Sequence, residues 1–172
     1  MNKTFPLLAI AAAVVAGCAT PAAGPTAVAT LAPTAGNATT GTVRFVQSGP
    51  RVLVSGEVRG LPPNSEHGFH VHEKGDCSSP DATSAGGHYN PAGRPHARHD
   101  APMHHAGDLP SLKADASGVA RFRFESDAIS VGPGVADIVG RGLIVHRDPD
   151  DYTSQPAGNA GPRLACAVIT NA

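Results

Sequence analysis

Apolar and polar side chains alternate along two short segments that flank a turn. The apolar positions of residues 42–47 and 52–58 fall mainly on one side of an extended chain. Such alternation is typical of a half-buried strand, because successive side chains of a strand point to opposite faces. Ser48, Gly49 and Pro50 lie between the segments and are turn formers. The pattern predicts a β-hairpin.

Three later segments also read as strands. Residues 120–125 alternate apolar with charged side chains, whereas residues 142–146 and 165–170 are short, mainly apolar runs that suit inward strands. No window of 12 residues holds a clean helical period. The abundance of glycine (20) and proline (16) agrees with a turn-rich chain. We therefore predict an all-β protein in which two antiparallel sheets pack together.

Two long connections separate the predicted strands. Residues 73–111 and 147–163 are too long for simple turns, and the first holds five of the nine histidines of the chain. Loops of this length inside a compact domain are usually functional or disordered. A metal ion would order them.

The N-terminus reads as an export signal. A short basic start at Lys3 precedes an apolar run over residues 7–16, which is too short to span a bilayer comfortably. The sequence Val-Ala-Gly-Cys at 15–18 resembles the lipobox of bacterial lipoproteins, in which the cysteine is lipidated. This predicts a signal peptide over residues 1–17 and a lipid anchor on Cys18, with the mature protein in the periplasm or cell envelope. An ordinary signal peptide is the alternative.

Residues 18–40 form a stretch of alanine, threonine, proline and glycine without charge or apolar periodicity. Such a composition is typical of a flexible tether. We expect one folded domain over residues 41–172. The net charge of −1 and the absence of a basic block argue against nucleic acid as a partner.

The histidine spacing predicts two metal sites. On a strand, His70 and His72 point to the same side, and His146 ends an apolar strand from which it could reach them. A site built from nitrogen alone suits Cu(II). His-x-His by itself is a weak signal, since most such pairs are surface coincidences.

The second predicted set comes from one loop and contains His88, His96, His105 and Asp108. Three imidazole nitrogens and a carboxylate oxygen form a four-coordinate set that zinc accepts. His104 directly precedes His105, so the register could slip by one residue.

Five separated motifs together resemble the copper/zinc superoxide dismutase family, particularly its bacterial exported branch. They are Gly-Phe-His-Val-His at 68–72, Ser-Ala-Gly-Gly-His-Tyr-Asn-Pro at 84–91, His-Ala-Gly-Asp-Leu-Pro at 105–110, Gly-Arg-Gly-Leu-Ile-Val-His at 140–146 and Gly-Asn-Ala-Gly-Pro-Arg-Leu-Ala-Cys at 158–166. Their order and spacing are those of the family, from about residue 41 to residue 172. The resemblance implies a Greek-key antiparallel β-sandwich or flattened barrel, for which this family is itself a standard example, with two long metal-binding and active-site loops.

The resemblance also implies the role of each site residue. The implied copper ligands are His70, His72, His88 and His146, and the implied zinc ligands are His88, His96, His105 and Asp108. His88 then bridges both metals. The spacing of nine residues from His96 and the His-x-Gly-Asp pattern favour His105 over His104. Asp150 matches a carboxylate that joins His70 to His96 without touching metal.

The implied reaction is dismutation of superoxide. One superoxide ion reduces copper and leaves as oxygen, and a second reoxidises it and leaves as hydrogen peroxide. His88 takes a proton during the cycle, zinc has a structural role, and Arg163 lies beside copper and guides the anion. Lys74, Arg94, Arg98 and Arg147 could also steer superoxide, but solvated surface charge is the simpler interpretation for them.

Cys77 and Cys166 match the disulfide of the family, and an oxidising compartment would favour their pairing. Such a link closes a long loop and would stabilise the fold by about 4 kcal/mol. A free buried thiol is the alternative.

Three other functions remain open. An exported copper or zinc binding or delivery protein on the same fold would need the ligands but not Arg163. A zinc hydrolase would need a general base, and Glu73 is the one glutamate next to a predicted metal ligand. A metal-free adhesion sandwich would not need the full ligand set. We expect an enzyme that protects the cell envelope from external superoxide, and we leave open whether it forms a homodimer.

Overall fold

A computed structural model describes Met1 and residues 24–172, and nearly all the regular secondary structure of this part is β-strand. A 3₁₀ turn, η1 (Thr83–Ala85), is the single helical element there. The strands are β1 (Thr26–Pro33), β2 (Thr40–Ser48), β3 (Arg51–Arg59), β4 (Glu66–His67), β5 (Phe69–His72), β6 (Leu112–Lys113), β7 (Ala120–Ser126), β8 (Gly142–His146), β9 (Arg163–Val168) and β10 (Thr170–Asn171). Among these residues, no helix has the length and apolar character needed to cross a membrane.

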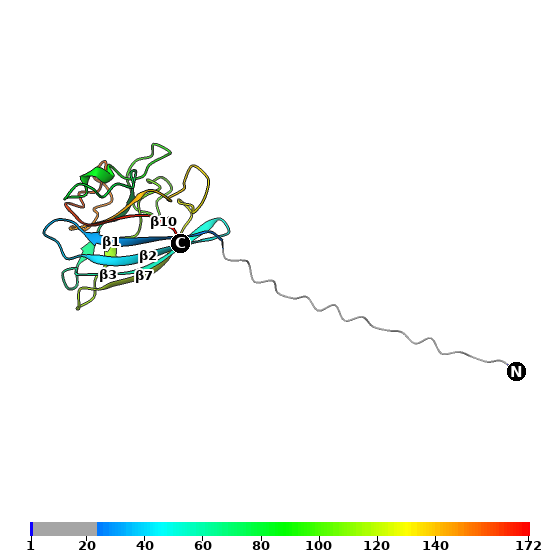
Figure 1. Ribbon diagram of the computed structural model, residues 1–172. Helices are drawn as coiled ribbons and strands as arrows, with labels where there is room; N and C mark the ends of the chain where they lie inside the picture. Colours follow the sequence, from blue (N-terminus) through cyan, green and yellow to red (C-terminus); the bar gives the residue numbers. More distant parts are fainter. Residues whose placement is uncertain (2–23) are drawn as a thin grey trace.

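Seven strands follow one another in a curled antiparallel sheet of order β5-β8-β9-β1-β2-β3-β7, with β10 also paired to β1. The strands β1, β2, β3 and β7 form one layer, and the long loops lie on the other side of it (Figure 1). The strands β5, β8 and β9 form the second layer. β1 belongs to both layers, because its first part pairs with β2 and its end pairs with β9. Strands distant in sequence are thus neighbours, as in a Greek key. The predicted all-β Greek-key barrel is confirmed.

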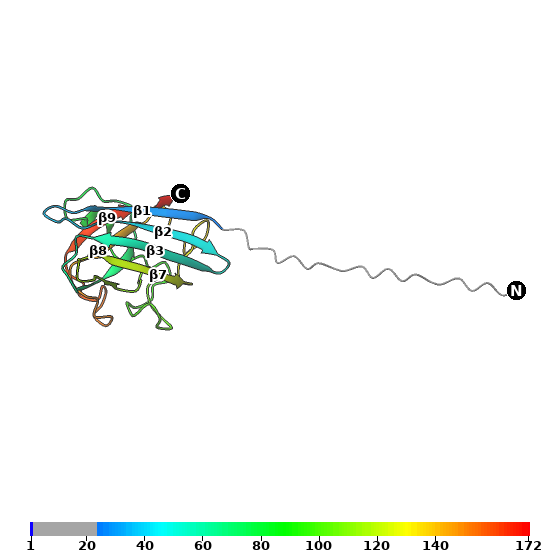
Figure 2. The ribbon, with the colours of Figure 1, turned by 90° about the horizontal axis from the view of Figure 1, so that it is seen from below.

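The predicted hairpin of β2 and β3 is confirmed, with Phe45 opposite Val54 across the pair. The whole length of β7 pairs antiparallel with β3 (Figure 2). Its alternation places Phe122 and Phe124 toward the core and leaves the intervening arginines exposed. Phe69 of β5 packs into the core from the other layer. Its ring lies edge to face with that of Phe122, with the ring centroids 5.4 Å apart. Burial of such side chains from both layers is the main driving force of the fold.

The prediction of a flexible tether over residues 18–40 is wrong for the part that the structure describes. β1 occupies Thr26–Pro33, with Ala27, Ala29 and Leu31 buried in the core. Alanine gives a weak apolar signal in the sequence, yet the backbone of β1 pairs with β2 on one side and with β9 and β10 on the other. The domain therefore begins before residue 41. The predicted signal peptide and Cys18 lie outside the described residues.

The predicted disulfide is confirmed between Cys77 and Cys166, whose Cα atoms are 5.8 Å apart. It joins the first long loop to β9, and the two cysteines pack with Ala82, Ala85 and Ile144 in a small apolar cluster beside the main core. One end of the first loop is thereby fixed to the barrel.

Candidate metal centre

Three of the predicted copper ligands come from two paired strands. β5 carries His70 and His72, and β8, its antiparallel neighbour, ends at His146. The pairing of β8 with β9 shifts between Val145 and His146. All three rings are buried, with at most 5% of each residue exposed. A rigid, hydrogen-bonded sheet therefore positions these imidazoles.

The first long loop is held against β5 by the main chain of Val71. The N–H of Val71 donates to the carbonyl of Gly107 at 2.9 Å, and the Val71 carbonyl accepts from the N–H of Tyr89 at 2.8 Å. A side chain on Gly107 would collide with the Val71 carbonyl and the Tyr89 nitrogen, so only glycine allows this approach. These hydrogen bonds place His88 beside His72 and Asp108 beside His70.

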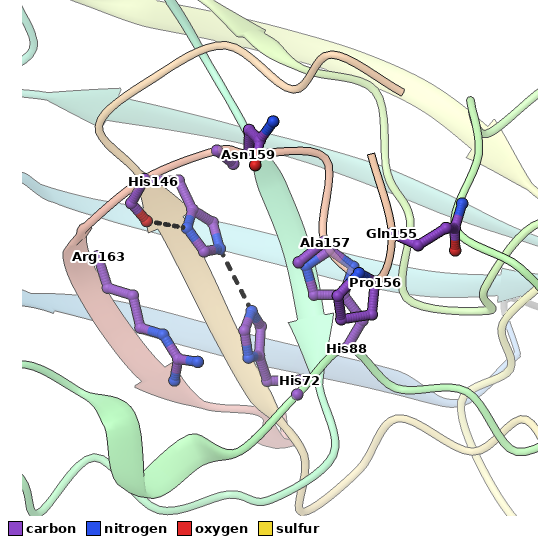
Figure 3. A pocket seen from close by; sticks show the side chains of 11 residues that line it. His72, His88, His146, Gln155, Pro156, Ala157, Asn159 and Arg163 are labelled. Atoms are coloured by element: carbon purple, nitrogen blue, oxygen red, sulfur yellow. Dashed lines mark hydrogen bonds between the residues drawn. The ribbon is translucent and has the colours of Figure 1, made fainter. Parts of the chain in front are cut away.

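The imidazoles of His72 and His146 face each other with their Nε2 atoms 3.3 Å apart (Figure 3). Each ring donates its Nδ1 proton to a carbonyl, that of Gly86 at 2.9 Å and that of Gly161 at 3.1 Å. In the neutral rings both Nε2 atoms then carry lone pairs and cannot hydrogen-bond each other. A cation between them would satisfy both.

Two more buried nitrogens near this pair lack a hydrogen-bond partner in the described structure. They are Nδ1 of His70 and Nε2 of His88. The opposite nitrogen of His70 bonds the Asp150 carboxylate at 2.7 Å, which directs the His70 Nδ1 lone pair away from that carboxylate. Ligand atoms of His70, His72, His88 and His146 all lie within 4.8 Å of one another. Buried polar atoms without partners are rare in proteins, and this group fits a metal with nitrogen ligands.

A second group gathers around one oxygen of Asp108. Its Oδ1 lies 2.9 Å from Nδ1 of His88, 3.0 Å from Nδ1 of His96 and 3.3 Å from Nδ1 of His105. All four residues are buried, and their ligand atoms also lie within 4.8 Å of one another. Three nitrogens and a carboxylate oxygen at this spacing fit a zinc ion.

His88 belongs to both groups, since its Nδ1 faces Asp108 while its Nε2 faces the nitrogen group. His104 belongs to neither, because its Nδ1–H donates to the main-chain carbonyl of His105 at 2.7 Å. His99 also lies outside both groups. The structure therefore brings together the residues of both predicted ligand sets, with His105 rather than His104 in the second.

Asp150 connects the two groups from behind. One oxygen lies 2.7 Å from Nε2 of His70 and the other lies 2.9 Å from Nε2 of His96. Gly158 lies against this contact with a φ of 62°, and a side chain there would collide with Asp150 and His96. Carboxylates that accept from ligand histidines fix the ring orientation and the tautomer.

Burial and neighbouring charges shift the pKa values of the histidines differently in the two groups. Burial lowers the pKa of His88 to about 4 and that of His146 to about 3, and it also lowers the pKa of His72. These rings are neutral at pH 7 and ready to bind a cation. Burial opposes charge on His96 as well, but Asp108 and Asp150 outweigh it and raise the pKa of His96 to about 9. Hydrogen bonds from the surrounding rings outweigh burial at Asp108 and lower its pKa, so it remains an anion.

A cavity of about 240 Å³ opens above the nitrogen group and is lined by His72, His88 and His146 (Figure 3). Arg163 is the one lysine or arginine among its lining residues within the described chain. Its guanidinium donates to the carbonyls of Ala82 and Gly86. Lys74, Arg94, Arg98 and Arg147 do not line the cavity. A small anion entering it meets one fixed cation next to the histidines.

Two residues that sequence reasoning missed also contact the site. Gln155 bonds the main chain of His96, and the hydroxyl of Thr34 donates to the main-chain carbonyl of Arg163 at 2.7 Å. Neither belongs to a metal-ligand pattern, and Thr34 lies in the segment interpreted as a tether. No local signal in the sequence could have identified them.

A nitrogen-only group and a nitrogen-oxygen group that share one imidazole, below a small cationic cavity in a β-barrel, define a two-metal oxidoreductase. The family model for copper/zinc superoxide dismutase (SODC) matches residues 39–169. The chain belongs to the copper/zinc superoxide dismutase family. Its function is the dismutation of superoxide, and its cofactors are copper and zinc.

Relatives extend over most of the domain. The chain is 44% identical over 135 residues to "Superoxide dismutase [Cu-Zn]" of Paramecium bursaria Chlorella virus 1, covering 75% of this chain and 71% of the relative. It is 39% identical over 133 residues to "Superoxide dismutase [Cu-Zn] 2" of Aquifex aeolicus (strain VF5), covering 75% and 78%. The solved structure titled "Crystal Structure Analysis of the clock protein EA4" matches with a TM-score of 0.77 and 37% identity, covering 86% of this chain and 94% of that one.

Proposed function

We propose that the nitrogen group of His70, His72, His88 and His146 holds copper and that the group of His88, His96, His105 and Asp108 holds zinc. The observation that carries this assignment is the pair of buried, unpartnered nitrogens on His70 and His88. Bound copper supplies one-electron redox chemistry, whereas zinc has no redox cycle and supplies a fixed charge.

The part played by His88 is the transfer of a proton. Its Nδ1 is held in the Asp108 group, so Nε2 is the atom that would gain a proton on the cavity side whenever it is not a copper ligand. A proton held at this atom lies where the reduced product forms, and hydrogen peroxide needs two protons to leave. His88 thus couples proton delivery to the position of the substrate.

The part played by Arg163 is the capture of the anion. Its guanidinium keeps its charge at working pH, and its two carbonyl contacts hold it at the cavity wall. Superoxide is small and singly charged, so one fixed cation beside the metal ligands suffices to orient it. Electrostatic steering of this kind accelerates association by roughly ten-fold to a thousand-fold and weakens as salt rises.

The test of the proposed function loads the protein with both metals, measures the metal content and then follows superoxide consumption. Arg163→Ile should keep both metals, lose most of the second-order rate and show a shallower decline with ionic strength. Arg94→Ile removes an exposed charge that does not line the cavity and serves as the control. Full activity in metal-replete Arg163→Ile would contradict the role in capture. Metal uptake without superoxide consumption in the parent would favour a copper or zinc delivery protein.

We also propose that the protein is exported and held to a membrane by a lipid on Cys18, where it protects the cell envelope. In the described fold, Thr26 lies at the end of the barrel beside the C-terminus, and its carbonyl accepts from Ala172. The other end of β1 pairs with Ala165, near Arg163. Eight residues of strand separate these ends by roughly 25 Å. The chain therefore enters β1 at the end of the barrel opposite the end near Arg163.

Replacing Cys18 tests the anchor. Cys18→Ala should yield a soluble or unprocessed protein that no longer partitions into detergent with the membrane fraction. Unchanged membrane association of this variant would contradict lipidation at Cys18.

A further inference from the structure

Gln155 at the rim of the cavity bonds the main chain of His96 in both directions. The N–H of His96 donates to Oε1 of Gln155 at 2.8 Å, and Nε2 of Gln155 donates to the His96 carbonyl at 2.8 Å. The two residues are 59 positions apart and belong to the two long loops. In the view of Figure 3, Gln155 lies on the opposite side of the cavity from Arg163. One side chain thus joins the two loops.

These bonds matter because His96 lies outside any strand and only 2% of it is exposed. Among the described residues, Gln155 is the one partner recorded for either polar group of the His96 main chain. A buried N–H or carbonyl without a partner is costly, so the Gln155 amide stabilises this backbone position.

The contact is independent of the carboxylates that hold the His96 ring. Asp108 bonds Nδ1 and Asp150 bonds Nε2, so both contacts orient the imidazole. Asp108 also accepts from the N–H of Ala97 at 3.3 Å, but neither carboxylate bonds the N–H or the carbonyl of His96 itself. Gln155 supplies this restraint from the loop that lines the cavity.

We propose that Gln155 is a positioning residue of the zinc site, which fixes the backbone of His96 and couples the zinc ligands to the cavity loop. This inference rests on the zinc assignment proposed above. Because such coupling is reciprocal, zinc occupancy stabilises the rim at Gln155 and loss of the Gln155 amide weakens the retention of zinc.

The test measures zinc release from the metal-loaded protein to a chromogenic chelator, with copper release followed in parallel. Gln155→Ala should release zinc roughly ten-fold faster, at the lower end of the effect of residues that orient ligands. Copper release should change much less. Gln47→Ala is the matched control, because the Gln47 amide also pairs with main chain in both directions, at Val131 and Gly49, far from the histidines.

Hydrogen exchange separates positioning from a general loss of structure. The His96 amide should exchange faster in Gln155→Ala but stay protected in Gln155→Glu, which keeps an acceptor for that N–H while losing the donor to the carbonyl. Zinc release from Gln155→Glu should be intermediate.

Parental zinc release and parental His96 exchange in Gln155→Ala would overturn the inference. Neither measurement uses superoxide, so a protein that binds both metals without consuming superoxide would contradict the proposed function and leave this test intact. A parent that takes up no zinc would overturn both.

Discussion

The direction of a single ring decides which of two adjacent histidines belongs to the group that we propose holds zinc. His104 and His105 are adjacent and both buried, yet only the His105 ring reaches Asp108. The His104 ring is committed to the carbonyl of its neighbour. The two adjacent rings therefore have different partners, and only the His105 ring joins the group around Asp108.

Alanine substitutions at these positions should therefore differ. His105→Ala or Asp108→Ala should lower zinc content far more than copper content, because each removes one donor of the second group and leaves the nitrogen group intact. His104→Ala should leave both contents near the parental value. Metal analysis of purified, reconstituted protein measures this. Loss of zinc from the His104 variant, with zinc retained in the His105 variant, would show that the ligand register is shifted by one.

Buried histidines also make the metal-free protein sensitive to acid. Unfolded histidines bind protons near pH 6.5, whereas burial lowers the pKa of His88 to about 4 and that of His146 to about 3 in the folded state. Between these values the unfolded chain binds more protons, so stability falls as the pH falls. His96 behaves oppositely, since its pKa is raised to about 9 and its contribution is present below pH 6.5 and lost toward pH 9.

The metal-free protein should accordingly have a lower denaturation midpoint at pH 5 than at pH 7. Replacing His146 by glutamine, which does not titrate, should make this decline smaller. Denaturant unfolding monitored at both pH values measures it. A midpoint that rises toward pH 5 in the metal-free parent would contradict the prediction.

At the level of elements, β1 does more than complete the sheet. The chain leaves β1 at Thr34, whose hydroxyl donates to the main-chain carbonyl of Arg163 and accepts from Nδ2 of Asn37 at 2.8 Å. Thr34 is 7% exposed. The first strand of the barrel therefore supports the residue that we propose captures superoxide.

Thr34→Val should remove this support while keeping the shape of the side chain. We expect a loss of about 1–2 kcal/mol in unfolding free energy and a rate of superoxide consumption several-fold lower, with metal content unchanged. Thr34→Ser should restore the rate.

Thr39→Val is the matched control, since Thr39 is also buried and its hydroxyl donates to the Gly60 carbonyl, away from Arg163. Similar rate losses in both valine variants would indicate a general effect of destabilisation rather than a role for Thr34 at Arg163.

At the level of the whole molecule, the disulfide couples fold stability to the site. Cys77 and Cys166 are 89 residues apart, and the loop that they close carries η1 and the Ala82 carbonyl that accepts from Arg163. The double variant Cys77→Ala/Cys166→Ala should lose about 4 kcal/mol of unfolding free energy in the chain-entropy model, and the double change leaves no unpaired thiol at these positions. Denaturant unfolding of the metal-loaded protein measures the loss. Reduction of the parent should reproduce it, and an unchanged midpoint in both cases would contradict the prediction.

By itself the sequence predicted the hairpin and the inward strands, because alternation is a local property of the chain. It predicted the two ligand sets from donor spacing together with the family resemblance. It also supplied the residues of the disulfide through family resemblance. Only the tertiary structure revealed that β1 is a strand, since its alanines give little apolar contrast and its pairing partners come from both ends of the domain. The same holds for Thr34 and Gln155, whose partners lie 129 and 59 residues away. A hydrogen bond between distant loops leaves no periodic trace, so folding alone decides which polar side chain completes the site.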